Sequence, residues 1–447
     1  MLALPDENPA RSRRGRSGGS LQAAESTVTF ASAGVPAALV TALARSGIVT
    51  PFPIQAATLP DALAGRDILG QGQTGTGKTL GFAIPLAARL ADGFTSACRP
   101  RGLVLVPTRE LASQVQAVLA PLASAAGLAT TVIFGGVPQN PQVMALRNRA
   151  DIVIACPGRL ADLIGQGHCH LGDVEITVVD EADQMADLGF LPAVRELLEA
   201  TPPGGQRMLF SATLDHAVDV LVRRFMNDPA RHNAGPTQAP LAMVHHLLTV
   251  TPADRTGVVA ALTGGRGRSL VFTRTKQRAH QLARQLTRAG IPAGELHGDL
   301  TQSSRQRNLA EFAAGATRVM VATDIAARGI HVDGIDLVIH ADSPAEHKAY
   351  LHRAGRTARA GAGGTVVTLQ TSAQAGEVRA IMRRARVAPR AATVTPRSAL
   401  LRSISGAPAP PVEPSAPSAP RPAAAPAVQA AGHGAAALSA TFRGRRR

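Results

Sequence analysis

The chain has 447 residues, 45% of them hydrophobic, and a formal net charge of +16 at pH 7. This length suffices for two ordinary domains with separate cores. Nowhere do 18 apolar residues follow one another, so we expect no membrane span. Gly and Ser follow the first arginines where a secretory signal would have an apolar stretch, so we expect no such signal. Three cysteines, an odd and sparse set, argue against a disulfide framework and favour a reducing cytoplasm.

The positive charge is concentrated near the C-terminus. Residues 379–447 contain twelve arginines and one glutamate, a net charge of +11, whereas residues 1–25 carry +1 and the long middle part only +4. Attraction to nucleic acid is therefore expected from the C-terminal end. Trp is absent and Tyr occurs once, so extensive stacking of bases on aromatic side chains is excluded. With three lysines against 44 arginines, we expect Lys78, Lys276 and Lys348 each to have a specific role.

From about residue 67, short apolar runs alternate with helical periods, which is typical of parallel α/β architecture. In the first half, a helix is predicted over 110–126 and buried strands at 67–71, 102–107, 151–155, 176–180 and 206–210. Pro, Gly and Asn cluster without periodicity at 227–241, which predicts a linker. In the second half, a helix is predicted over 276–289 and strands at 244–250, 269–273, 318–323, 336–341 and 365–369.

These elements predict two α/β domains with parallel sheets, over residues 26–226 and 242–378, joined by the linker 227–241. Residues 1–25 are expected to be a disordered basic segment. Residues 379–447 are rich in Ala, Pro and Arg and end in RGRRR, which predicts a basic tail that is largely disordered.

The segment GQTGTGKT at 72–79 follows a predicted strand and precedes a helix, which is the context of a phosphate-binding loop. Its glycines let backbone N–H groups approach phosphates, and the helix N-terminus favours negative charge. Lys78 is expected to reach the β and γ phosphates, and Thr79 to bind Mg²⁺. The alternative is a Gly-rich turn without function. The residues expected to hold the nucleotide are Gly72, Gln73, Thr74, Gly75, Thr76, Gly77, Lys78 and Thr79.

The segment VVDEAD at 178–183 delivers acids at the carboxyl end of a buried strand, where ligands bind in open α/β sheets. Asp180 is expected to hold Mg²⁺, and Glu181 to orient and deprotonate the attacking water. A solvated helix start is the alternative, which the phosphate-binding loop disfavours. The tract His168-Cys169-His170 is a weaker metal candidate, because neighbouring side chains point in different directions and no second ligand pair follows.

Together with further motifs in the same order, these segments resemble the DEAD-box ATP-dependent RNA helicases over residues 30 to about 370. The matching segments are PTRELA at 107–112, Gly135-Gly136, PGR at 157–159, DEAD at 180–183, SAT at 211–213, VFTRT at 271–275, HGDLTQSSR at 297–305, ATDIAARG at 322–329 and HRAGRTAR at 352–359. The resemblance implies two tandem RecA-like domains that bind ATP and Mg²⁺, bind single-stranded RNA, and hydrolyse ATP.

The segment GIVTPFPIQ at 47–55 resembles the family's adenine-recognition element. The resemblance implies that Gln55 reads the N6 and N7 edge of adenine, since an amide carries both a donor and an acceptor. It also implies that Phe30 packs on the base. Without the resemblance, Phe30 would be a hydrophobic staple and Gln55 a surface residue. Phe52 stands where the family usually has Thr.

In the second half, Arg356 and Arg359 resemble arginine fingers, which stabilise charge on the transferred phosphoryl group, so hydrolysis would require closure of the domains. Ala358 replaces a Gly that is common in the family. The resemblance further implies that one set of residues couples hydrolysis to RNA engagement, namely Asp183, Ser211, Thr213 and His352.

One departure concerns the ribose of ATP. After Arg328-Gly329-Ile330 the family usually has an Asp that contacts the ribose, and this chain has His331. Neutral His offers one acceptor and one donor, where a carboxylate can accept from both ribose hydroxyls. Asp333 lies two residues on, and in an extended segment it would project from the same face and compensate.

The resemblance also implies an RNA surface of hydroxyls, guanidinium groups and a close-approach glycine, suited to phosphate and ribose rather than to base edges. Binding would then be independent of sequence, and contacts to 2′-hydroxyls would distinguish RNA from DNA. Cys156 stands where the family usually has Thr, which puts one phosphate contact in doubt. The residues implied are Arg109, Gly136 and Arg159 in the first domain and Thr273, Arg305 and Thr323 in the second.

The expected function is therefore that of an ATP-dependent RNA helicase that separates short duplexes or remodels RNA–protein complexes. A DNA helicase or translocase with the same core is one alternative, which the DEAD segment and the Gln55 element disfavour. The other is an ATP-independent RNA-annealing or clamping protein that acts through its basic tail. We expect a cytoplasmic monomer with ribosomal or RNA-decay partners.

Overall fold

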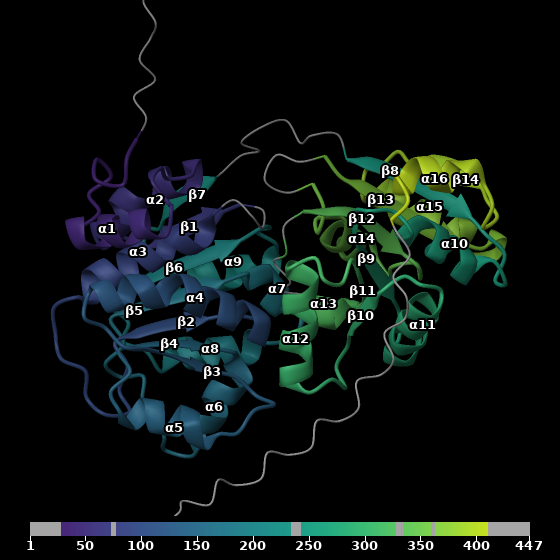
Figure 1. Cartoon of the computed structure of the whole chain (residues 1–447). Helices are drawn as coiled ribbons and strands as arrows, with labels where there is room; N and C mark the ends of the chain where they lie inside the picture. The colour runs from purple at the N-terminus through teal and green to yellow at the C-terminus, as the bar shows by residue number, and fades with distance from the viewer. Residues whose placement is uncertain are drawn as a thin grey trace, which may run out of the picture.

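The structure is a computed structural model that describes residues 28–72, 77–233, 243–327, 332, 334–358 and 363–409. Two α/β domains lie side by side, the first coloured purple to teal and the second green to yellow (Figure 1). Each contains a seven-stranded sheet in which every paired strand is parallel. The predicted fold class of two tandem parallel α/β domains is confirmed.

The first sheet has the strand order β3-β4-β2-β5-β6-β1-β7. Its strands are β1 (Ile68–Gln71), β2 (Gly102–Leu105), β3 (Thr130–Ile133), β4 (Ile152–Ala155), β5 (Ile176–Asp180), β6 (Gln206–Ser211) and β7 (Ala230–Asn233). The helices of this domain are α1 (Ala37–Arg45), α2 (Pro53–Leu63), α3 (Lys78–Leu90), α4 (Arg109–Ala125), α5 (Asn140–Arg147), α6 (Pro157–Gly165), α7 (Ala182–Asp187), α8 (Leu191–Glu199) and α9 (His216–Phe225).

The second sheet has the order β10-β11-β9-β12-β13-β8-β14. Its strands are β8 (Val244–Thr249), β9 (Arg268–Thr273), β10 (Ala293–Leu296), β11 (Val319–Thr323), β12 (Ile335–His340), β13 (Thr365–Gln370) and β14 (Arg390–Thr393). The helices are α10 (Arg255–Thr263), α11 (Lys276–Arg288), α12 (Gln302–Ala313), α13 (Asp324–Ala327), α14 (His347–Ala354), α15 (Ala375–Arg384) and α16 (Ala399–Ser405), with a 3₁₀ turn, η1, at Ser372–Gln374.

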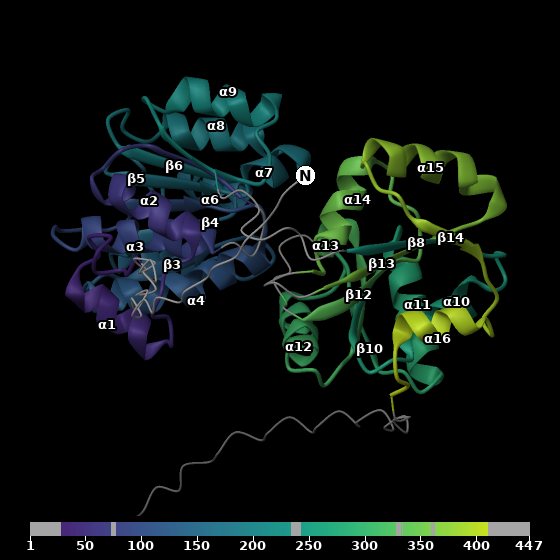
Figure 2. The same ribbon diagram turned by 90° about the horizontal axis from the view of Figure 1, so that it is seen from above.

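Helices cover both faces of each sheet (Figure 2), so the central strands are buried on both sides. Successive residues of a strand therefore enter different cores. Ile152 and Ile154 of β4 belong to one apolar cluster, and Val153 and Ala155 to the other. This explains why the strands appear in the sequence as continuous apolar runs.

All ten predicted strands and both predicted helices are present, within two residues at either end. Four strands lack a predicted counterpart, namely β3, β7, β10 and β14. These are the four edge strands of the two sheets, where exposure permits polar residues such as those of the β7 sequence ARHN.

Two predicted boundaries are wrong. The linker was expected over 227–241, but β7 pairs with β1 over residues 230–233. The tail was expected from 379, but β14 pairs with β8, and α16 buries Leu401 in the second core. Arginines and alanines dominate this region, so its average composition does not reveal its few core residues. The rest of the predicted tail, and the N-terminal segment, lie almost wholly outside the described residues.

Candidate functional site

Lys78, the first residue of α3, reaches back to the backbone at the end of β1. The Lys78 side chain is 7% exposed, and its Nζ donates to the carbonyl oxygen of Gly72 at 2.8 Å. Gly77, which precedes the helix, has φ +85°, and a Cβ there would lie 2.5 Å from Nε2 of Gln55. Only glycine therefore fits this turn. The half-buried Thr79 follows in the first turn of α3, and the predicted loop residues Gln73, Thr74, Gly75 and Thr76 lie outside the described residues.

Gln55 lies beside this loop, as the resemblance led us to expect. Its side chain is fully buried; Oε1 accepts from the backbone N–H of Phe52 at 2.9 Å, and Nε2 donates to the carbonyl oxygen of Gly77 at 2.8 Å. An amide has two N–H groups and two lone pairs, so one donor and one acceptor position remain. Gln55 thus joins the start of α2 to the phosphate-binding loop, and its contact with adenine stays a prediction.

The aromatic side chain nearest to this loop is not the one expected. Phe30 is 2% exposed and belongs to the core of the first domain, which leaves its ring almost no surface for a base. Phe52 is 58% exposed, and its ring lies against Gly77. The sequence shows that Phe replaces the usual Thr at position 52. Where the Phe52 ring lies depends on how α2 packs beside the loop, which the sequence does not show.

The two carboxylates of the DEAD segment lie at the carboxyl end of β5. Asp180 is fully buried, and burial raises its pKa to about 7; the charge of Lys78 opposes this rise, and Glu181 adds to it. Glu181 adopts φ +53° as the chain turns from β5 into α7. This left-handed conformation is costly for any residue other than glycine. The fold therefore holds two carboxylates together beside one buried ammonium group.

Replacing Asp180 with Asn is expected to stabilise the nucleotide-free protein increasingly as pH rises. Folding raises the pKa of this carboxyl from 3.8 to about 7. Between these values the folded state keeps a proton that the unfolded state has released, so its stability falls as pH rises. Thermal unfolding of both proteins without Mg²⁺ or nucleotide should show the smallest difference near pH 5 and the largest near pH 8. A difference that does not grow with pH would contradict the assignment.

Asp183, Ser211 and Thr213 form one hydrogen-bonded group, as expected. Oδ2 of Asp183 accepts from the backbone N–H of Thr213 at 3.0 Å and from its Oγ1 at 3.1 Å. The Ser211 hydroxyl donates to the carbonyl oxygen of Thr213 at 2.7 Å and accepts from the backbone N–H of Asp183 at 3.2 Å. The end of β6 is thereby tied to α7, two residues from Glu181. The structure brings the three residues together, and their coupling role stays a prediction.

Helix α14 of the second domain faces these elements. Nζ of Lys348 lies 3.2 Å from Oδ2 of Asp215, the N-cap residue of α9. Nδ1 of His352 lies 3.7 Å from Oδ2 of Asp187, at the end of α7. Lys348 thus contacts the first domain, and a specific role for each lysine stays a prediction. Lys276 forms an exposed ion pair with Asp299.

Of the two predicted arginine fingers, Arg356 is 7% exposed and follows α14, and Arg359 lies outside the described residues. Arg353, in the last turn of α14, donates two hydrogen bonds to the Asp324 carboxylate within the second domain, at 2.5 and 2.7 Å. Ala358 adopts φ +54°, which gives a physical reason why glycine is common there. His331 and Asp333 also lie outside the described residues.

The three RNA residues predicted in the first domain come together. Gly136 has φ +76°, and a Cβ there would lie 2.1 Å from Nη1 of Arg109, so the guanidinium rests directly on this glycine. Arg159 reaches the carbonyl oxygen of the adjacent Val137 at 3.5 Å. Cys156 caps α6 without a side-chain hydrogen bond, and burial raises the pKa of its thiol to about 12, so it stays neutral.

The three RNA residues predicted in the second domain are buried in this arrangement. Thr273 has no exposed surface, and Thr323 is 9% exposed. Nε of Arg305 lies 2.8 Å from Oε1 of Glu110 in the first domain, and both side chains are at most 10% exposed. Contact of Arg305 with RNA therefore requires its pair with Glu110 to open, and RNA contact by all three residues stays a prediction. Sequence reasoning missed Glu110, although it lies inside the PTRELA segment.

Comparison with known families agrees with this geometry. The model of the DEAD/DEAH box helicase family matches residues 52–221, and that of the helicase conserved C-terminal domain matches residues 255–361. The chain belongs to the DEAD-box helicase family. The two matched regions coincide with the two α/β domains, which are therefore RecA-like.

Similar proteins include the DEAD-box ATP-dependent RNA helicase 3B, chloroplastic, of Zea mays, 42% identical over 80% of this chain and 49% of that protein. The ATP-dependent RNA helicase RhlB of Xanthomonas oryzae pv. oryzae is 40% identical over 76% of this chain and 61% of that protein. The chain thus spans about half to three fifths of these two relatives. Among solved structures, S. cerevisiae Dbp5 bound to RNA and ADP BeF3 is 26% identical with a TM-score of 0.71, covering 82% of this chain and 95% of that one.

Proposed function

We propose that this DEAD-box protein is an RNA-stimulated ATPase that uses ATP to separate short RNA duplexes or to remodel RNA–protein complexes. The main support for the proposal is the position of Asp180 and Glu181 at the end of β5, close to Lys78. Helix α14 of the second domain contacts α7 and the start of α9, which lie next to these carboxylates. Catalytic groups at such a boundary act only when the two domains are correctly placed. The relatives' names and the RNA-bound S. cerevisiae structure support the same function.

The described residues fit ATP and Mg²⁺. The buried ammonium of Lys78 donates to the backbone carbonyl of Gly72, and phosphate oxygens would give it stronger, charge-assisted hydrogen bonds. The buried carboxyl of Asp180, with its raised pKa, would be stabilised as the anion by a nearby cation. Mg²⁺, bound through Asp180 and Thr79, would neutralise charge on the phosphate oxygens.

The protein's own groups then have separate tasks. Lys78 holds the phosphates, and Glu181 orients the attacking water and accepts its proton. Asp183 is hydrogen-bonded to Thr213 and Ser211, so a movement at the end of β6 would also move α7. Arg356 and Arg359 complete the site from the second domain and stabilise charge on the transferred phosphoryl group. Turnover thus depends on the arrangement of the domains.

RNA is proposed to bind across both domains through its backbone. Arg109 and Arg159 offer guanidinium groups for phosphates, and Gly136 permits close approach. Arg305, Thr273 and Thr323 would join the surface once the pair between Arg305 and Glu110 rearranges. A protein that grips one strand in this way separates a short duplex by keeping that strand from pairing.

Strand separation tests this function against ATP-independent annealing or clamping. A short RNA duplex with a single-stranded extension should separate when the full chain and ATP–Mg²⁺ are present, and should stay paired with ADP or without nucleotide. Separation that is equal in all three conditions would overturn the proposal.

The C-terminal region is proposed to add sequence-independent attraction to RNA. Residues 410–447 carry five arginines and one glutamate. Deleting them, while keeping the core residue Leu401, should flatten the plot of log affinity against log salt by up to about 3, at roughly 0.7 per neutralised phosphate of a single strand. ATPase activity without RNA should be unchanged.

The matched control keeps the length of this region and replaces its five arginines with glutamine. It should reproduce the deletion if charge is responsible. An unchanged slope in both variants would mean that the region does not touch RNA.

A cytoplasmic location, a monomeric state and ribosomal or RNA-decay partners remain proposals. Among the described residues, no helix has the length and apolar character to cross a membrane.

A further inference from the structure

Three potential metal ligands meet at the edge of the second sheet, away from the proposed ATP site. They are His280 of α11, Glu295 of β10 and His297 directly after β10. Nδ1 of His280 lies 2.8 Å from Oε2 of Glu295, and Nε2 of His297 lies 3.5 Å from the same oxygen. All three donor atoms lie within 4.8 Å of one another. In the described part of the chain, this is the one such group of three or more.

Chain geometry explains why the group forms. Glu295 and His297 are two residues apart at the end of a strand, so their side chains project from the same face. Helix α11 packs against β10 on this face and brings in His280. Donors about 3.3 Å apart are what a tetrahedral ion with bonds of about 2.0 to 2.1 Å requires, so small side-chain movements suffice.

His297 is the independent sign that a ligand is missing. Its side chain is 9% exposed, and neither ring nitrogen has a hydrogen-bond partner. A buried imidazole without partners is costly, because it has given up water and gained nothing. The pair between His280 and Glu295 satisfies those two groups but leaves His297 unsatisfied. An ion held jointly by all three would satisfy each of them.

We propose that His280, Glu295 and His297 form a site for a borderline divalent cation, Zn²⁺ in the first instance. Two imidazoles and one carboxylate are a donor set that suits Zn²⁺, and they leave one position for water. Mg²⁺ and Ca²⁺ prefer oxygen donors and would bind poorly.

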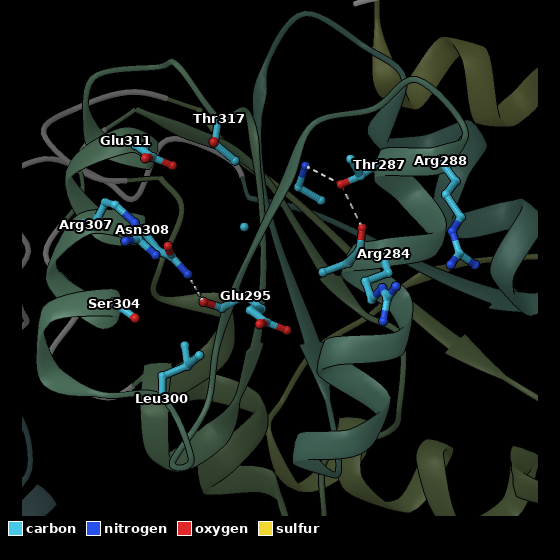
Figure 3. A pocket seen from close by; sticks show the side chains of 13 residues that line it. Arg284, Thr287, Arg288, Glu295, Leu300, Ser304, Arg307, Asn308, Glu311 and Thr317 are labelled. Atoms are coloured by element: carbon cyan, nitrogen blue, oxygen red, sulfur yellow. Dashed lines mark hydrogen bonds between the residues drawn. The ribbon is translucent and has the colours of Figure 1, made fainter. Parts of the chain in front are cut away.

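The site is accessible from solvent through His280, whose side chain is 52% exposed. Glu295 also lines a cavity of about 520 Å³ between α11 and α12, which neither histidine lines (Figure 3). The backbone carbonyl of Glu295 accepts from Nδ2 of Asn308 at 2.9 Å, which fixes β10 against α12. Arg284 and Arg307 also line the cavity. Their positive charges oppose a cation, but both side chains are exposed and screened by water.

The position connects the site to the domain contact. The carbonyl oxygen of His297 accepts from Nη1 of Arg305 at 3.3 Å, and Arg305 pairs with Glu110 of the first domain. An ion bound by His297 would fix the segment that supports Arg305.

Calorimetric titration with Zn²⁺ alone tests the proposal. The full chain, without a polyhistidine tag and freed of metal by a chelator, should bind one Zn²⁺ through this cluster. His280→Ala and Glu295→Gln should each weaken that binding by about 100-fold or more, since loss of a supporting partner alone costs 10- to 100-fold. His280 is exposed, so its replacement should not disturb folding.

The matched control is His170→Ala, which removes an exposed imidazole from the tract His168-Cys169-His170. It should leave Zn²⁺ binding unchanged. The proposal is overturned if the parent chain binds no Zn²⁺ stoichiometrically, if both cluster variants bind as the parent does, or if His170→Ala loses the same binding event. Circular dichroism of each variant separates loss of a ligand from loss of fold.

Discussion

Glu181→Gln is expected to retain ATP binding and to lower RNA-stimulated ATP hydrolysis by roughly 100- to 10,000-fold, the usual contribution of a general base. The amide keeps the shape of the side chain but cannot accept the proton of the attacking water. ATP-bound RNA complexes of this variant should therefore accumulate. Binding of a fluorescent ATP analogue, measured beside phosphate release, separates the two steps.

Two further variants serve as controls for this result. Glu196→Gln makes the same chemical change at an exposed position of α8, and it should hydrolyse ATP normally. Lys78→Ala should instead lose ATP binding, because it removes the ammonium group that lies over the loop. Normal RNA-stimulated hydrolysis by Glu181→Gln would show that this carboxylate is not the base.

Arg305→Ala is expected to weaken the arrangement of the two domains seen in the structure and, separately, to lower RNA-stimulated hydrolysis, because Arg305 is also a proposed RNA contact. In the structure Arg305 and Glu110 form an ion pair with both side chains almost fully buried. Removing one partner of a buried pair costs about 3 to 5 kcal/mol when the other stays buried. Here the domains can separate and rehydrate Glu110, so the cost falls on the RNA-free arrangement in which the pair forms. We expect the population of that arrangement, relative to separated domains, to fall by about 100-fold or more, the factor that corresponds to about 3 kcal/mol. RNA-stimulated ATPase activity should fall as well, through the lost RNA contact.

Arg307→Ala is the matched control, because Arg307 lies two residues on in α12 and is exposed. It should close and hydrolyse ATP as the parent does. Energy transfer between dyes on the two domains measures closure directly. Equal closure by Arg305→Ala and the parent would contradict an interdomain role for the pair.

The sequence predicted the interior of each sheet well and its edges poorly. Central strands such as β5 are buried on both faces and appear as apolar runs, whereas β7 and β14 are largely exposed and rich in polar residues or alanine. The same reasoning failed for the C-terminal boundary, because the pairing of β14 with β8 depends on contacts across more than 140 residues.

The site shows a similar division. Local motifs identified Lys78, Asp180 and Glu181, since strand–loop–helix geometry determines where they lie. Long-range packing determined the rest. It buried Phe30 and placed Phe52 at the loop, and it joined Arg305 to Glu110. The metal-ligand cluster was not predicted either, because His280 and Glu295 belong to different elements that meet only in the fold.

The most direct test of the account is the ATP hydrolysis rate of the full chain without nucleic acid, with single-stranded RNA, and with DNA of the same sequence. We expect slow hydrolysis without nucleic acid, strong stimulation by RNA and little stimulation by DNA, because the proposed surface contacts the ribose as well as the phosphates. Equal stimulation by DNA would favour a DNA helicase or translocase. No stimulation by either nucleic acid would contradict the coupling of ATP hydrolysis to RNA binding.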